Sequence, residues 1–89
     1  MNNEVTLDEK INVAAVFRDS AKSCQPLTFK RPNGQEINIT EIGLRHPTKH
    51  GKRMVHIFDV TDGRADYRLE FDAERLTWKL LYIRDEYGA

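Results

Sequence analysis

The sequence lacks the features of a secreted or membrane-inserted protein. It contains a single cysteine, Cys24, which cannot form a disulfide within the chain and fits a reducing compartment. No apolar run approaches the roughly 18 residues of a membrane-spanning helix. The N-terminus, MNNEVTLDEK, has neither the basic start nor the apolar block of a secretory signal. We therefore expect a cytoplasmic protein that makes no contact with a membrane.

The chain also lacks net charge, because 14 Lys and Arg balance 14 Asp and Glu. The charge is unevenly spread, however. Residues 28–56 carry six bases against two acids, and residues 57–89 carry eight acids against five bases. The neutral total weakens the case for a nucleic-acid-binding protein, whereas the basic middle segment favours one. Cross-strand pairing of opposite charges on a solvated sheet explains the same distribution.

The segment TLDEKINVAAVFRDSAKS predicts a helix over about residues 6–24. Thr6 and Glu9 have the spacing of a capping box, and Pro26 ends the segment. At 100° per residue one broad stripe is apolar; it contains Leu7, Ile11, Ala14, Phe17, Ala21 and Cys24. We expect this stripe to pack on a sheet, because a small sheet needs a cover.

From Leu27 onward the pattern is typical of antiparallel strands, over about residues 27–84. Asn33-Gly34 and Asp62-Gly63 are strong hairpin signals. The apolar residues change face between Ile39 and Ile42, which predicts a bulge near Thr40–Glu41 that bends the strand. Alternation in DYRLEFD and LTWKLLYI predicts buried faces; these would contain Tyr67, Leu69 and Phe71 in the first strand, and Leu76, Trp78, Leu80 and Tyr82 in the second.

These patterns predict one α+β domain over residues 1–89. One N-terminal helix would pack on a five-stranded antiparallel meander. A bent and strongly twisted meander could curl into a small half-open barrel, and the alternative is a flat sheet with the helix on one face.

The stretch RHPTKHGKRMVH, residues 45–56, contains all three histidines of the chain and no acid. We expect it to form a hairpin tip. His46 and His50 have a spacing found in zinc sites, but Pro47 and Gly51 disfavour the helix that would bring their rings together. A small metal-dependent enzyme using these histidines is therefore only an alternative hypothesis.

The same tip is a candidate contact for nucleic acid or another polyanion, because flexible Lys and Arg side chains can neutralise phosphates. The candidate residues are Lys30, Arg31, Arg45, Lys49, Lys52 and Arg53. A charged tip that only keeps the hairpin soluble and blocks edge pairing is the competing explanation.

No Walker or Rossmann glycine pattern occurs, and no histidine is placed to activate Ser20 or Ser23. We therefore assign no catalytic residue, no cofactor and no metal ligand. The sequence favours a small non-enzymatic binding or accessory protein with an unidentified nucleic-acid or protein partner. A structural subunit that buries an open sheet edge in a homodimer is a further alternative.

Overall fold

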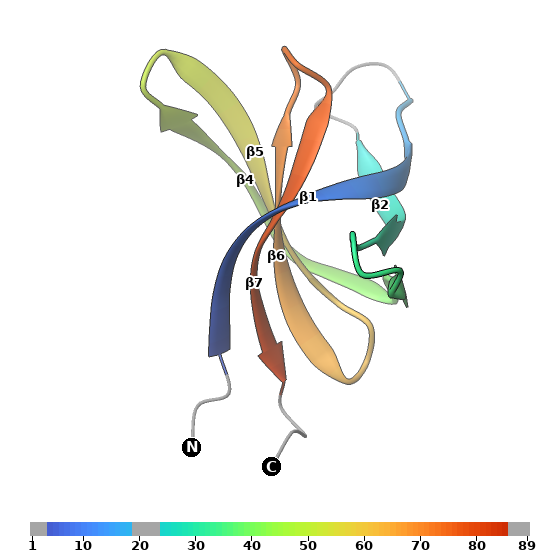
Figure 1. Cartoon of the computed structure of the whole chain (residues 1–89). Helices are drawn as coiled ribbons and strands as arrows, with labels where there is room; N and C mark the ends of the chain where they lie inside the picture. The colour runs from blue at the N-terminus through green and yellow to red at the C-terminus, as the bar shows by residue number, and fades with distance from the viewer. Residues whose placement is uncertain (1–3, 19–23, 86–89) are drawn as a thin grey trace.

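The computed structural model describes residues 4–18 and 24–85, and this part of the chain is all β (Figure 1). Its seven strands are β1 Glu4–Val16, β2 Gln25–Lys30, β3 Glu36–Asn38, β4 Glu41–His50, β5 Arg53–Thr61, β6 Ala65–Asp72 and β7 Thr77–Asp85. They form one antiparallel sheet in the order β3-β2-β1-β7-β6-β5-β4.

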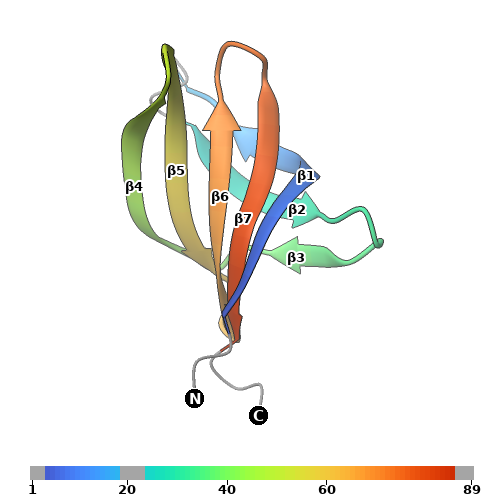
Figure 2. The ribbon, with the colours of Figure 1, turned by 60° about the vertical axis from the view of Figure 1, so that its left-hand side comes forward.

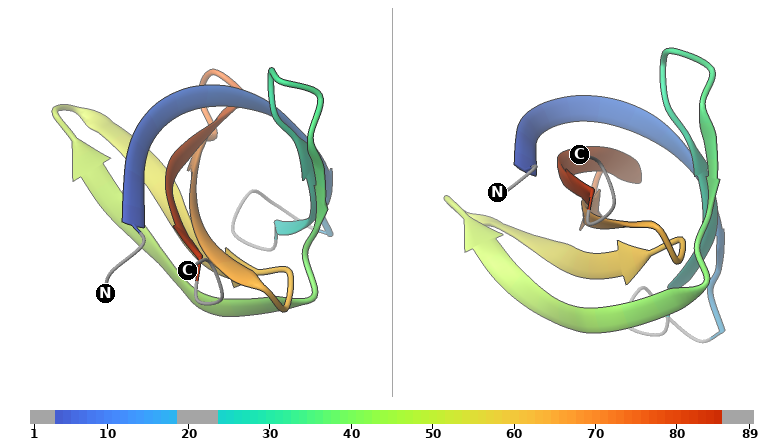
Figure 3. Two further views of the ribbon diagram at one scale, coloured as in Figure 1. Left: turned by 60° about the horizontal axis from the view of Figure 1, so that its bottom comes forward. Right: turned by 90° about the horizontal axis from the view of Figure 1, so that it is seen from below.

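The sheet curls into a half-barrel because the chain bends at two places, within β1 and between β3 and β4. β1 pairs with β7 through Glu4–Ile11 and then with β2 through Asn12–Val16. On the opposite side only Ile39 and Thr40 separate β3, which pairs with β2, from β4, which pairs with β5. Figures 2 and 3 show the resulting curl, with β2 and β3 folded over the longer strands. The flat-sheet alternative is therefore wrong.

The predicted helix over residues 6–24 is wrong. Residues 4–16 form a strand, and residues 19–23 lie outside the described part of the chain. The exposure of β1 alternates with a period of two, and its inner face holds Leu7, Glu9, Ile11, Val13 and Ala15. The apolar residues of this segment fit a strand about as well as a helix. The acid Glu9 stands at one of the inward positions and so obscures the strand pattern in the sequence. β1 pairs first with β7 and then with β2, and such pairing overrides a weak local helix preference.

The α+β class and the five-stranded meander are corrected accordingly. β1 is a strand of the sheet, and the predicted bend splits residues 36–50 into β3 and β4. The register between β4 and β5 shifts between Ile42 and Leu44, close to the predicted bulge. The Asn33-Gly34 hairpin is confirmed, and Gly34 has the positive φ of 92° that such turns require.

The core lies on the inner face of the curled sheet. Tyr67, Leu69 and Phe71 are buried as predicted, and Trp78 is only 7% exposed. Two predicted positions on this face are wrong. Leu76 lies in the β6–β7 turn and is 73% exposed. A register shift next to Leu69 turns Tyr82 to the outer face, where it pairs with Arg68.

Within the described residues there is no helix that is long and apolar enough to cross a membrane.

Candidate functional site

The basic stretch of residues 45–56 lies in the β4–β5 hairpin, but most of it is paired strand rather than the loop at the tip that the sequence predicts. The strand pairing continues to His50 and Arg53, so the turn consists of only Gly51 and Lys52. Gly51 has a φ of 65°, which glycine adopts without steric cost. Because the turn is short, Lys49 and Lys52 are held at the end of a regular hairpin.

The six candidate polyanion contacts differ in their surroundings. Two of them are held by acids: Arg31 donates hydrogen bonds to Glu9 at 2.7 and 3.1 Å, and Arg53 pairs with Asp72. Arg45 lies over the ring of Phe58, with its guanidinium carbon 5.1 Å from the ring centroid. Lys30, Lys49 and Lys52 are exposed and form no ion pair with another described residue.

The structure does not gather these six residues into one patch. Lys30 and Arg31 lie at the β2–β3 hairpin, and the other four lie on the β4–β5 hairpin. The two hairpins point in different directions from the half-barrel (Figure 2). The sequence grouped these residues because they are close along the chain, whereas the fold divides them between two tips.

The histidines do not converge. His46 and His50 lie four residues apart on β4, which separates them by roughly 13 Å at about 3.3 Å per residue. His56 pairs with Pro47, and its ring lies 6.3 Å from the buried ring of Phe71, on the opposite face from His46. Residues 4–18 and 24–85 contain no group of three or more His, Cys, Asp or Glu side chains that could hold a metal. This geometry gives the metal-dependent enzyme hypothesis no support.

Asp72 anchors both the β4–β5 hairpin and the β6–β7 turn. Its Oδ2 pairs with Arg53, and its Oδ1 accepts hydrogen bonds from the backbone N–H groups of Glu74 and Arg75 at 3.0 and 3.2 Å. Burial raises the pKa of Asp72, but these hydrogen bonds outweigh burial and hold the pKa below its ordinary value. Arg53 is therefore a structural cation rather than an available one.

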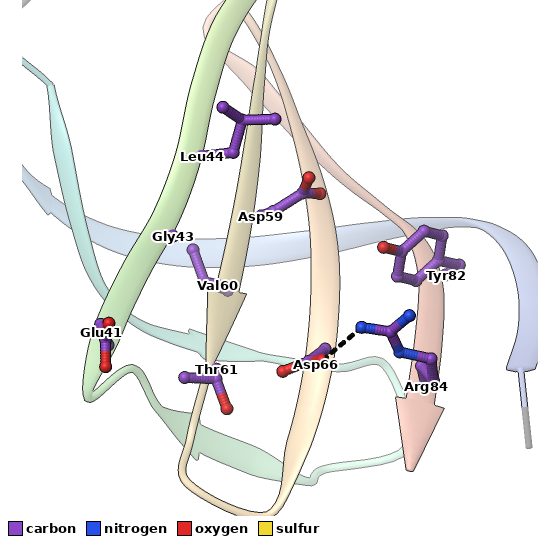
Figure 4. Close-up of a pocket in the computed structure, with 9 residues that line it drawn as sticks. All are labelled: Glu41, Gly43, Leu44, Asp59, Val60, Thr61, Asp66, Tyr82 and Arg84. Atoms are coloured by element: carbon purple, nitrogen blue, oxygen red, sulfur yellow. Dashed lines mark hydrogen bonds and ion pairs between the residues drawn. The ribbon is translucent and has the colours of Figure 1, made fainter. Parts of the chain in front are cut away.

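A hollow of about 320 Å³ lies on the outer face of the sheet (Figure 4). Three acids line it: Glu41, Asp59 and Asp66. The cations nearby are already engaged, since Arg84 pairs with Asp66 at 2.7 Å and Arg68 donates two hydrogen bonds to Asp59. The hollow is therefore poorly suited to an anion.

Two further hollows, of about 550 and 540 Å³, lie along β1 and share Lys10 and Asn12. Apolar residues dominate the first, which includes Phe17, Leu76 and Trp78. Basic residues dominate the second, which includes Lys30 and Arg31. The sequence did not predict this surface, because Lys10 and Phe17 fall within the helix predicted over residues 6–24. The period-two alternation of residues 7–15 is the signal that could have placed them on a strand.

Cys24 is buried and does not resemble a nucleophile. Its side chain is 1% exposed within the core cluster. Burial raises the pKa of the Cys24 thiol above its usual value, although the nearby charge of Arg45 acts in the opposite direction. A neutral, enclosed thiol behaves as a small apolar side chain.

Comparison with protein-family models, with curated proteins and with solved structures found no match. The function is therefore inferred from the geometry and charge of the described residues.

Proposed function

We propose that the protein is a small non-enzymatic binding protein that contacts nucleic acid or another polyanion through its basic hairpin tips. The observation that carries this proposal is the contrast within the six candidate residues. Arg31 and Arg53 are held by acids, whereas Lys49 and Lys52 project from the end of the β4–β5 hairpin without an ion-pair partner among the described residues. Lys30 supplies a similar cation at the second tip.

Exposed lysines on a regularly paired hairpin suit a phosphate backbone. Each lysine keeps its charge and its hydration until it meets a phosphate, and binding then releases the counterions of the polyanion. Because the whole chain is formally neutral, we expect modest affinity that falls steeply with salt. The free thiol of Cys24 supports a reducing compartment and hence a cytoplasmic location.

The other two hypotheses have less support. His46, His50 and His56 do not converge, and residues 4–18 and 24–85 hold no ligand set for a metal-dependent enzyme. The outer edge of β4 is open in the sheet order, which is the feature that a homodimer would bury. That edge contains Pro47 and charged side chains, and these discourage the pairing of one edge strand with another.

The test measures binding of a fluorescent DNA duplex over a series of salt concentrations. Replacing Lys49 and Lys52 together by Gln should weaken binding and reduce the slope of log K against log salt by about two units, roughly one per lost phosphate contact. Each lysine is also replaced alone and matched with Arg64→Gln, which removes one charge at the exposed β5–β6 turn. Stability should change by less than about 0.5 kcal/mol in all of these variants.

Two results would contradict the proposal. One is the absence of duplex binding by the unmutated chain at low salt. The other is an equal effect of Arg64→Gln and of either lysine replacement, because that would show a response to net charge rather than to the hairpin tip.

A further inference from the structure

The two hollows along β1 form a continuous surface, here called the β1 groove, because Lys10 and Asn12 line both of them. The groove arises where β1 leaves β7. Ile11 is the last β1 residue paired with β7, opposite Trp78, and Asn12 is the first paired with β2, opposite Lys30. The strand therefore carries Lys10 and Asn12 from one sheet region into the other.

Among the described residues that line either hollow there is no acid, whereas Lys10, Lys30 and Arg31 are basic. Arg31 is held by Glu9, so Lys10 and Lys30 supply the available charge. Lys10 lies directly opposite Lys79 in the β1–β7 register, but Lys79 pairs with Asp8 at 3.2 Å and so leaves Lys10 as the unpaired cation of the two. Neither Lys10 nor Lys30 has an ion-pair partner in the part of the chain that the structure describes. The hollow of Figure 4 has the opposite character, with three acids.

The other end of the β1 groove presents apolar side chains to solvent. Phe17 is 47% exposed and Leu76 is 73% exposed. The ring of Phe17 lies 5.7 Å from that of Phe71, and Phe71 stacks on Trp78 at 4.5 Å. Phe17 is thus the exposed end of an aromatic cluster that extends into the core. Leu76 has a φ of 56°, a left-handed conformation that leucine rarely adopts and that is often found at binding sites.

We propose that the β1 groove binds single-stranded nucleic acid. A base lies against Phe17 and Leu76, and the adjoining phosphates contact Lys10 and Lys30. Asn12 and Val16 lie four residues apart on β1, a span of up to roughly 13 Å at about 3.3 Å per residue, and Phe17 follows Val16. The β1 groove therefore accommodates a few nucleotides rather than a lone anion. Exposed rings beside unpaired cations are the combination by which proteins hold single strands.

The ring of Phe17 is the reason for proposing single-stranded rather than double-stranded nucleic acid. The bases of a duplex are stacked on one another and cannot offer a face to Phe17, whereas an unpaired base can. This inference rests on the proposed function in taking a polyanion as the ligand. It adds a second contact surface and a preference that lysines at a hairpin tip would not produce.

The test compares a fluorescent oligodeoxythymidylate with a duplex of the same length at low salt. We expect the unmutated chain to bind the single strand about tenfold more tightly. Phe17→Leu, which keeps an apolar side chain but removes the ring, should lose most of that preference, and Phe17→Tyr should retain it. Val16→Ala is the matched control, because Val16 is the adjacent residue and is similarly exposed, at 42%. Lys10→Gln should reduce the salt slope for the single strand by about 0.7.

The outcomes separate the two proposals. Equal affinity for single strand and duplex, or full retention of the preference in Phe17→Leu, would overturn the β1 groove. If Lys49→Gln with Lys52→Gln still weakens duplex binding in that case, the hairpin tip stands. If the Phe17 and Lys10 variants lose single-strand binding while the tip variant binds normally, the β1 groove stands and the tip assignment fails. If the unmutated chain binds neither probe, both proposals fail.

Discussion

Glu9 and Arg31 form a bidentate ion pair at the rim of the half-barrel, with Nε–Oε1 and Nη2–Oε2 distances of 2.7 and 3.1 Å. The pair joins β1 to the turn after β2. The hydrogen bond from Arg31 lowers the pKa of Glu9 more than burial raises it. This ion pair explains why β1 tolerates an acid, Glu9, on its inner face. It also means that Arg31 is not available as a polyanion contact.

The Glu9→Gln variant tests this pair. It removes the charge that holds Arg31, so we expect the free energy of unfolding to fall by about 1–2 kcal/mol in a urea titration. Glu36→Gln is the control, because it removes an exposed acid at the start of β3 and should change stability by less than about 0.5 kcal/mol. Equal stability of Glu9→Gln and the unmutated chain would show that the pair contributes nothing to folding.

The Asp72–Arg53 pair predicts acid sensitivity. The folded-state pKa of Asp72 lies below its ordinary value. Its contribution to stability is therefore complete above the unfolded-state pKa, near 3.9, and is lost as the pH falls through the lower folded-state value. We expect Asp72→Asn to lose about 2–3 kcal/mol at neutral pH, and to lose less stability than the unmutated chain on acidification.

The control for Asp72 is Asp66→Asn. Asp66 pairs with Arg84, but both side chains are more exposed, at 29% and 46%, than Asp72 at 3%. Replacing Asp66 should cost less than about 1 kcal/mol. Equal losses for the two variants, measured by urea unfolding at several pH values, would count against the special role of the buried carboxylate.

Leu76 predicts a stabilising substitution. A left-handed conformation costs a leucine roughly 1–2 kcal/mol and costs glycine little. Because the side chain is 73% exposed, little apolar burial is lost with it. After allowing for the greater freedom of glycine in the unfolded chain, Leu76→Gly should raise the free energy of unfolding by about 0.5–1 kcal/mol.

Leu76→Ala separates backbone strain from the side chain. Alanine keeps the steric cost of the positive φ, so this variant should not gain stability. A melting temperature that rises equally in the alanine and glycine variants would show that the exposed side chain, not the backbone, is unfavourable. Both variants should weaken single-strand binding if Leu76 contacts the base.

Trp78 should be a highly sensitive core position. It is 7% exposed, stacks on Phe71 at 4.5 Å and lies 5.5 Å from the ring of Phe58. Truncation of such a residue to alanine typically costs about 3–5 kcal/mol, a large part of the stability of a small domain. Trp78→Ala should therefore lose the strand signal in circular dichroism at room temperature. Val5→Ala, at an apolar site that is 54% exposed, should retain it.

Local patterns in the sequence were enough to place several elements of the sheet. The alternation of Tyr67, Leu69 and Phe71 predicted their burial because a strand has only two faces. The Asp62-Gly63 turn was also predictable, since Asp62 accepts hydrogen bonds from the backbone N–H groups of Arg64 and Ala65, two and three residues ahead. These features depend on neighbours in the chain, which a sequence displays directly.

Long-range strand pairing and ion pairing determined the conformation of β1 and which charges remain exposed. Residues 7–17 suit a helix and a strand about equally, and β1 is a strand because β7 and β2 satisfy its backbone. The cations Arg31 and Arg53 are neutralised by acids 22 and 19 residues away, so no local pattern could separate them from Lys49 and Lys52. The β1 groove likewise depends on long-range pairing, because β1 leaves β7 after Ile11 and one hollow is then lined by Lys10, Phe17, Leu76 and Trp78. Composition determined how many charges and rings the chain has, and the long-range register of the sheet determined which of them remain exposed.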